Sequence, residues 1–294
     1  MSAQPEAAGT IYDIGYRHYD GPRLGRRGAI SAMVSAGLRA VFGLGRSGRS
    51  KIIPWGAVVF ALMPAVVAVA IRVLAGDLLD LYTYENYLWE IGALMPIFVA
   101  AQAPELVVND IRHHVLPLYF SRPMGRFDYV ASKVVALGLG LLSLTLVPVL
   151  LLFLGQVLAA EDVAAALGDE IGALPGILGN GLLHAVVLAS LGIAICSLAA
   201  RRAYAAGAVL AIFLVGGVIG AIFTESGGNL REIAPFVSPL AIIDGAREWL
   251  FGGAAPQSPV GASGVPLPVY GLATLVLLLI SWAILALRYR RISV

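Results

Sequence analysis

Residues 134–158 read VVALGLGLLSLTLVPVLLLFLGQVL and contain no Asp, Glu, Lys, Arg or His. A helix that crosses the roughly 30 Å hydrocarbon core of a bilayer needs about 20 mostly apolar residues. Such a segment must be helical because lipid cannot satisfy backbone amide and carbonyl groups, whereas a helix satisfies its own. The stretch is long enough, and we therefore predict that it is a transmembrane helix.

Five more runs share this character, although the second is interrupted by Glu90 and Pro96. The six predicted spans are residues 55–75, 87–103, 134–158, 176–200, 203–223 and 269–287. The composition agrees, since 59% of the residues are hydrophobic and 13% are charged, whereas about a quarter are charged in soluble proteins. The chain is therefore expected to be an all-α integral membrane protein with six transmembrane helices.

The distribution of positive charge predicts the orientation. All but three of the 20 Lys and Arg residues fall on the side of the bilayer that would hold both termini; the exceptions are Arg72, Arg231 and Arg247. Cationic segments are retained in the cytoplasm, so both termini are expected there. Residues 1–28 lack the apolar core of a cleavable signal peptide. We expect a multi-pass protein of the bacterial cytoplasmic (inner) membrane.

Two domains are predicted, a cytoplasmic tail (1–54) and a six-helix transmembrane domain (55–291). Within the tail, residues 29–43 place apolar side chains at helical spacing: Ile30, Met33, Val34, Leu38, Val41 and Phe42. This pattern predicts an amphipathic helix lying in the cytoplasmic interface. An ordinary surface helix in a soluble tail is the alternative.

The cytoplasmic loop 104–133 combines charge with an apolar patch, which consists of Val115, Leu116, Leu118, Tyr119 and Phe120. Exposed apolar surface with a charged rim commonly marks a docking site. Pro123 should end a short helix near Phe120, and a new helix should start by Phe127. The alternative is a helical turn that packs only on its own bundle.

On the outer side, the apolar positions of residues 230–251 are interrupted by Pro235 and Pro239. This segment is too short to span and is expected to form helices in the outer interface, with Trp249 as an anchor. Residues 252–268 are rich in Gly, Pro and Ser and predict an irregular connector.

The sequence lacks the usual constellations of an enzyme, and we expect no catalytic, cofactor or metal residue in this chain. Gly261-Ala262-Ser263-Gly264 matches a serine-protease pattern, but no histidine follows it to act as the base. Neither lysine, Lys51 or Lys133, belongs to a GxxxxGK[ST] phosphate loop. A single cysteine excludes a disulfide framework, and a net charge of +2 argues against nucleic-acid binding.

A few residues within or near the spans are unusual. His184 lies inside the fourth span, where it either forms a structural hydrogen bond to a neighbouring helix or marks a pathway. Gly216 and Gly220 form a small-xxx-small face suited to close helix packing, within the chain or between copies. Arg72 and Glu90 lie near outer span ends and can reach the interface.

The stretch Leu116-Pro117-Leu118-Tyr119-Phe120-Ser121-Arg122-Pro123, followed by Arg126, Tyr129 and Lys133, is similar to the "LLLSRP, then R, Y and GK" stretch of type-2 ABC exporter permeases. Ser132 stands where that family often has glycine. Val237-Ser238-Pro239-Leu240 resembles the "SPL" of the family's outer helices. With the predicted topology, the resemblance extends from about residue 17 to 291.

This resemblance implies the type-2 ABC exporter permease fold and an export function driven by a separate ATPase, on which ATP and Mg are expected. It implies an ATPase-coupling interface at Asn109, Asp110, Arg112, His113, His114, Leu116, Leu118, Tyr119, Phe120 and Arg122, with Arg201 and Arg202 as a second contact. Two permeases would face each other in a 2+2 complex, as a homodimer or with a paralogue. His184, Gly216 and Gly220 are the candidates for the pathway or dimer seam.

Two other functions remain open from the sequence. A membrane subunit of this class can relay ATPase motion to a periplasmic partner without transporting anything. A secondary transporter would need no ATPase, but spans 134–158, 203–223 and 269–287 contain no Asp, Glu, Lys, Arg or His, which argues against proton coupling.

Overall fold

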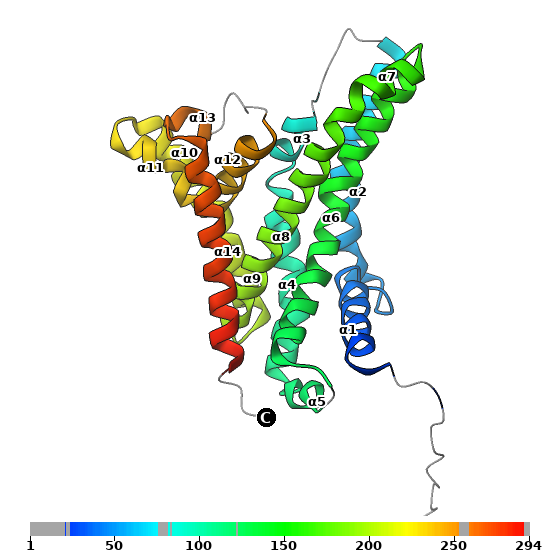
Figure 1. The fold of residues 1–294 in the computed structure, drawn as a ribbon. Helices are drawn as coiled ribbons and strands as arrows, with labels where there is room; N and C mark the ends of the chain where they lie inside the picture. Colours follow the sequence, from blue (N-terminus) through cyan, green and yellow to red (C-terminus); the bar gives the residue numbers. More distant parts are fainter. Residues whose placement is uncertain are drawn as a thin grey trace, which may run out of the picture.

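The computed structural model describes residues 21, 24–75, 82, 84–121, 123–252 and 259–290, and this part of the chain is helical without any strand. Within it, six helical segments are long and apolar enough to cross a membrane. They are Arg49–Leu74, Leu94–Arg112, Arg126–Ala159, Val163–Leu198, Arg202–Ser226 and Leu267–Arg290. The predicted all-helical class is confirmed for the described residues, and six helical segments able to cross a membrane indicate a multi-pass membrane protein (Figure 1).

The elements follow one another as α1 (Gly25–Val41), α2 (Arg49–Ala75), α3 (Tyr84–Glu90), α4 (Leu94–Arg112), α5 (Leu116–Phe120), α6 (Arg126–Ala159), α7 (Val163–Glu170), the 3-10 turn η2 (Ile171–Ala173), α8 (Leu174–Leu198), α9 (Arg202–Leu210), the π turn η3 (Ala211–Val215), α10 (Gly216–Ser226), α11 (Asn229–Val237), α12 (Pro239–Phe251), α13 (Pro259–Ser263) and α14 (Leu267–Arg290). The α5 end of the bundle carries α1, α5 and the carboxyl end of α14, and the opposite α7 end carries α3, α7 and α11 to α13 (Figure 1). Amino-terminal α1 and the end of α14 therefore lie on the same side.

Helix α8 forms the centre of the bundle, where it contacts α4, α6, α9, α12 and α14. Glycines allow this close packing. A Cβ atom at Gly181 would lie 2.2 Å from Leu146 Cδ2, and one at Gly192 would lie 2.3 Å from Val99 Cγ1. The small residues of α8 therefore set the spacing of the core.

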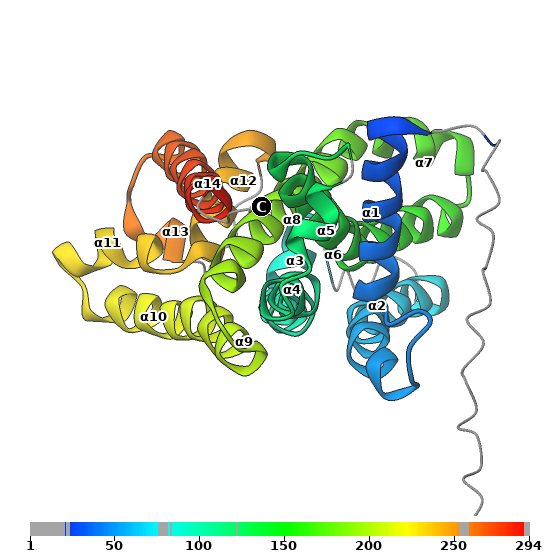
Figure 2. The same ribbon diagram turned by 90° about the horizontal axis from the view of Figure 1, so that it is seen from below.

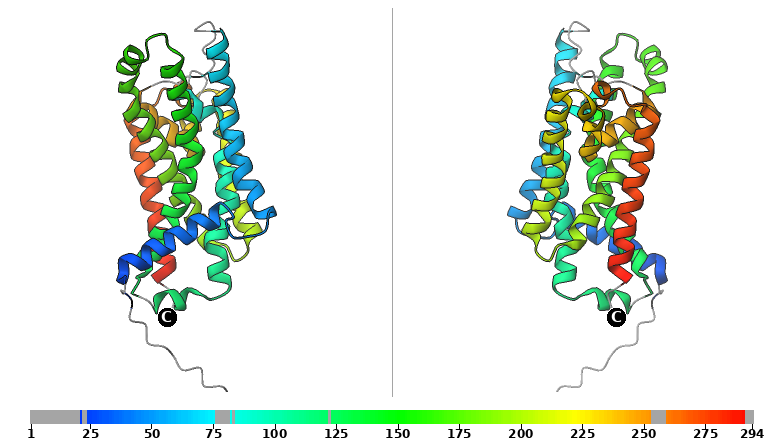
Figure 3. Two further views of the ribbon diagram at one scale, coloured as in Figure 1. Left: turned by 90° about the vertical axis from the view of Figure 1, so that its right-hand side faces the viewer. Right: turned by 90° about the vertical axis from the view of Figure 1, so that its left-hand side faces the viewer.

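Helix α1 crosses the foot of α6 at an angle to the bundle (Figures 2 and 3). Its buried residues Met33, Gly37 and Val41 recur every four positions and form one stripe. A Cβ at Gly37 would lie 2.7 Å from Ala136 Cβ, and one at Gly140 would lie 2.7 Å from Val41 Cγ1. The helix predicted over residues 29–43 is therefore present, and part of its apolar face packs against α6.

The second span differs from the prediction. The chain forms two helices there, because α3 ends at Glu90 and α4 begins at Leu94. Pro96 lies in the first turn of α4, where its missing amide costs no hydrogen bond. The helix also extends beyond the predicted span end at residue 103, since α4 continues through Pro104 to Arg112. Proline is tolerated inside such helices when neighbouring helices pack around it, and Pro104 is buried.

The other helices agree more closely with expectation. Helix α5 ends at Phe120 and α6 begins at Arg126, as the break at Pro123 predicted. α6 has 34 residues and is therefore roughly 51 Å long. The segment 230–251 folds into the short helices α11 and α12, and the predicted irregular connector contains the helical turn α13.

Candidate functional site

Helix α5 is the outermost element at its end of the bundle (Figure 1). Its two leucines have opposite environments, because Leu116 is 3% exposed and Leu118 is 68% exposed. Tyr119 and Phe120 pack against the Tyr129 ring of α6, with ring centroids 5.7 Å and 6.2 Å away. Leu116 therefore belongs to the chain's own core, which corrects its assignment to a partner surface, whereas Leu118 projects outward.

Polar residues flank α5 on both sides along the chain. Arg112, His113 and His114 are exposed, and His114 adopts a positive φ of 51° in the turn between α4 and α5. The Arg126 guanidinium lies 6.0 Å from the centre of the Phe120 ring. Arg122, which was also assigned to this surface, lies outside the described residues.

Asp110 has partners within the chain. Its carboxylate accepts a hydrogen bond from the Tyr129 hydroxyl at 2.8 Å and lies 2.8 Å from Lys133 Nζ. The Lys133 side chain is only 8% exposed, and that of Asp110 is 16% exposed. Asp110 therefore joins α4 to α6 beneath α5, a role different from the predicted contact with a separate subunit.

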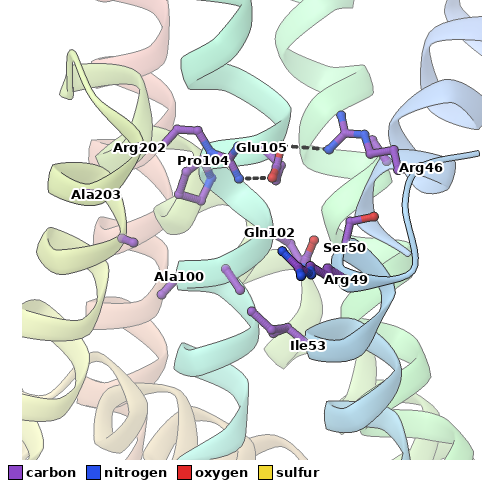
Figure 4. Close-up of a pocket in the computed structure, with 13 residues that line it drawn as sticks. Arg46, Arg49, Ser50, Ile53, Ala100, Gln102, Pro104, Glu105, Arg202 and Ala203 are labelled. Atoms are coloured by element: carbon purple, nitrogen blue, oxygen red, sulfur yellow. Dashed lines mark hydrogen bonds and ion pairs between the residues drawn. The ribbon is translucent and has the colours of Figure 1, made fainter. Parts of the chain in front are cut away.

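Glu105 is the centre of a second ionic cluster, to which α4, α9 and the segment before α2 contribute (Figure 4). Arg46 Nη1 donates to Glu105 Oε2 at 2.9 Å, and Arg202 Nη2 donates to Glu105 Oε1. Asn109 Nδ2 donates to Oε2 at 3.2 Å. Two predicted interface residues, Asn109 and Arg202, are thus brought together by a carboxylate that the sequence analysis did not identify.

A cavity of about 310 Å³ lies beside this cluster. It is lined by residues from α1, α2, α4, the start of α9 and the segment before α2, and its cations are Arg46, Arg49 and Arg202. Arg201, the other predicted residue of the second contact, is exposed, with its guanidinium 6.0 Å from the centre of the Tyr204 ring.

Arg26 and Asp128 join α1 to the start of α6. Arg26 Nε and Nη2 donate to the two carboxylate oxygens at 2.8 Å and 2.7 Å, an arrangement that is stronger than a single contact. The hydrogen bond that Arg26 donates to Asp128 raises the pKa of Arg26 above its ordinary value. Asp128 Oδ2 also accepts a hydrogen bond from the Gly125 amide at 2.9 Å. The start of α6 therefore holds α1 in place.

His184 lies in the middle part of α8, on the wall of a cavity of about 380 Å³. Gly220 and Asp244 line the same cavity. The Nδ1 atom of His184 lies 3.0 Å from the Asn180 carbonyl, which is on its own helix and not on a neighbouring one as expected. Two of the three predicted pathway residues, His184 and Gly220, therefore meet at one cavity.

The glycine face of α10 is occupied by the chain itself. A Cβ at Gly216 would lie 2.7 Å from the Val237 carbonyl oxygen, and one at Gly220 would lie 2.9 Å from the Ala234 carbonyl oxygen. Both contacts are with α11, and they leave no room for a second copy at these glycines. The suggestion of a dimer seam at Gly216 and Gly220 is therefore corrected to an intramolecular packing face.

The sequence indicated Arg247 only as a cation of the outer side, whereas it and Asp244 are buried on α12 at 2% and 5% exposure. Opposite charges three residues apart within an apolar segment could have indicated an internal pair. Among the described residues, no group of three His, Cys, Asp or Glu side chains could hold a metal ion.

In comparisons with known proteins, no protein-family model matches this chain and no characterised protein matches its sequence.

Proposed function

We propose that this chain is the membrane subunit of an ATP-driven exporter of the type-2 ABC class, and that a separate ATPase binds at the α5 end. The observation that carries the proposal is the projecting helix α5. Leu116 and the aromatic rings anchor it to the bundle while Leu118 is left 68% exposed. An apolar side chain presented among exposed Arg and His residues suits a protein contact.

The charge distribution supports a cytoplasmic position for this end. Residues of the α5 end include Arg26, Arg46, Arg112, Arg126 and Arg202, and such clusters remain on the cytoplasmic side. A cytoplasmic ATPase could reach α5 there. ATP and Mg would be held by that partner, and this chain would supply the route through the bacterial inner membrane.

Ionic contacts provide a way for movement of α5 to reach the bundle. Asp110 ties the base of α5 to α6 through Tyr129 and Lys133. Glu105, on the same helix α4, holds Arg46 and Arg202 beside α2 and α9. A displacement of α5 would therefore move several spans together, as a rigid-body transition between two states requires. A second six-span subunit, identical or paralogous, would complete the pathway.

The test is co-purification from native membranes. Tagged wild-type protein should retain a protein that hydrolyses ATP, and Leu118→Asp should release it because an unpaired carboxylate is costly at an apolar contact. Leu167→Asp is the matched control, since Leu167 is exposed on the short helix α7 at the other end. Retention of the ATPase by Leu118→Asp at the wild-type yield, or no ATPase with the wild type, would contradict the proposal.

Activity provides the second test. Vesicles that contain the permease and its ATPase should move substrate in a nucleotide-dependent manner, and Leu118→Asp should abolish the movement. ATPase turnover without any movement of solute across the bilayer would instead favour the relay function.

A further inference from the structure

Arg247 is a buried cation with weak contacts. Its side chain is 2% exposed, on α12 near the α7 end. Nε lies 3.5 Å from Asp244 Oδ1 and has no hydrogen-bond partner, and Nη1 reaches the Gly252 carbonyl only at 3.5 Å. A guanidinium carries five donors, and a buried charge is costly unless it is paired and hydrogen-bonded. These contacts leave much of the hydrogen-bonding capacity of the Arg247 guanidinium unused.

The guanidinium borders a cavity of about 370 Å³ between α3, α8 and α12. Asn180 of α8 lies on the same wall and is 5% exposed. The Oδ1 atom of Asn180 has no hydrogen-bond partner either. The cavity therefore offers a cation with free donor capacity beside a free acceptor, which together suit an anion that also carries a donor.

The neighbouring carboxylate does not cancel this charge fully. Burial raises the pKa of Asp244 to about 7, although the nearby Arg247 acts in the opposite direction. Asp244 therefore carries its negative charge less readily than an ordinary aspartate, and a second anion can be accommodated near Arg247.

Exposed apolar side chains form part of the rim of the cavity. Leu250 and Phe251 line the cavity and are 51% and 37% exposed, and Trp249 beside them is 48% exposed. The Phe251 ring fits a notch at Gly179, where a Cβ would lie 2.4 Å from the ring. Aromatic and apolar side chains of this kind gather at the level of lipid head groups.

We propose that this cavity binds the phosphate ester of a lipid head group that carries a neighbouring hydroxyl, with Arg247 on the phosphate and Asn180 on the hydroxyl. The planar guanidinium suits a phosphate through paired hydrogen bonds. The cavity accommodates a head group, and the exposed apolar rim lies where the acyl chains would pass. This inference does not depend on an ATPase partner.

The experiment measures ligand binding to the purified full chain in neutral phosphatidylcholine nanodiscs. Short-chain phosphatidylglycerol should raise the unfolding temperature of the wild type, and short-chain phosphatidylcholine should have a much smaller effect. Arg247→Gln and Asn180→Ala should each weaken the apparent Kd for phosphatidylglycerol, the former by at least roughly tenfold. Glycerol phosphate and inorganic phosphate form separate arms, and binding of either one as tightly as the lipid would identify a soluble phosphate as the ligand.

Arg231→Gln is the matched control, because Arg231 is exposed on α11 at the same end of the bundle and its loss should leave the affinity unchanged. Asn180→Ala keeps the cation and removes only a buried group without a partner at Oδ1, so it should fold even where Arg247→Gln does not. Wild-type affinity in the two site variants, or equal responses of the wild type to the two lipids, would overturn the proposal.

Discussion

The Tyr129 hydroxyl of α6 donates a hydrogen bond to the Asp110 carboxylate of α4 at 2.8 Å, closing the segment that carries α5. Lys133 Nζ lies 2.8 Å from the same carboxylate and 5.2 Å from the centre of the Tyr129 ring. The three side chains hold the two ends of the projecting segment together. The tip is therefore presented from a fixed base.

Lys133→Met tests this base. The substitution leaves Asp110 without its cation in a largely buried place, and breaking such a pair typically costs about 3 to 5 kcal/mol. We expect a clearly lower free energy of unfolding in detergent and faster hydrogen exchange over residues 113–121. Adding Asp110→Asn to Lys133→Met removes the unpaired charge and should recover much of the loss; a double variant no more stable than Lys133→Met would show that the pair is not the cause.

Glu105→Gln tests the second cluster. The change removes the charge that holds Arg46 and Arg202, whose side chains are 42% and 47% exposed. Contacts of partly exposed pairs are weak, at about 1 kcal/mol or less, so the unfolding temperature should fall by a few degrees. We expect a larger effect on nucleotide-dependent transport, measured against Glu90→Gln at the opposite end. Equal transport by these two variants would remove Glu105 from the coupling route.

Gly140→Leu tests the packing of α1 against α6. A Cβ at this position already lies 2.7 Å from Val41 Cγ1 and 3.4 Å from the Phe98 ring, so a larger side chain must displace α1. Overpacking costs typically 1 to 3 kcal/mol. The variant should unfold at lower temperature and expose α1 to proteolysis, whereas Gly217→Leu, at an open position, should not. An unchanged cleavage rate would contradict the packing.

Asp244 predicts a dependence of stability on pH. Burial raises its pKa from 3.8 to about 7, so between these values the folded state binds the proton that the unfolded state releases. The contribution of Asp244 to the free energy of unfolding is therefore fully present below about pH 4 and is lost as the pH rises toward 7. Asp244→Asn should reduce that slope in thermal unfolding scans from pH 5 to pH 8. The same slope in the variant would show that another group titrates.

Much of the fold could be predicted because the apolar runs of α6, α9 to α10 and α14 contain few charges and are at least as long as a transmembrane helix requires. The second span was harder, since its limits depend on packing. A Cβ at Gly92 would lie 2.9 Å from the Trp89 carbonyl oxygen, which suits a break there, and Pro104 continues its helix because it is buried. A local sequence pattern cannot report either environment.

The site could be predicted in position but not in detail. The proline rule correctly placed the end of α5 and the start of α6. It could not show which leucine faces outward, because Leu116 and Leu118 are two positions apart, about 200° around a helix, and both fit an apolar patch. Glu105 and Asp110 gained their roles from arginine and lysine partners far along the chain, and distant pairings of this kind leave no local signal.

Helix α6, at roughly 51 Å, is about 20 Å longer than the hydrocarbon it crosses. The first turns of α6, which contain Asp128, Tyr129 and Lys133, thus extend beyond the hydrocarbon toward the aqueous phase. Buried Pro148 lies farther along the same helix, where its missing amide leaves one backbone carbonyl without a partner and favours bending. If the amino-terminal part of α6 tilts, the helix can bend at this proline. A small lateral displacement at one face of the membrane would then produce a larger displacement at the other.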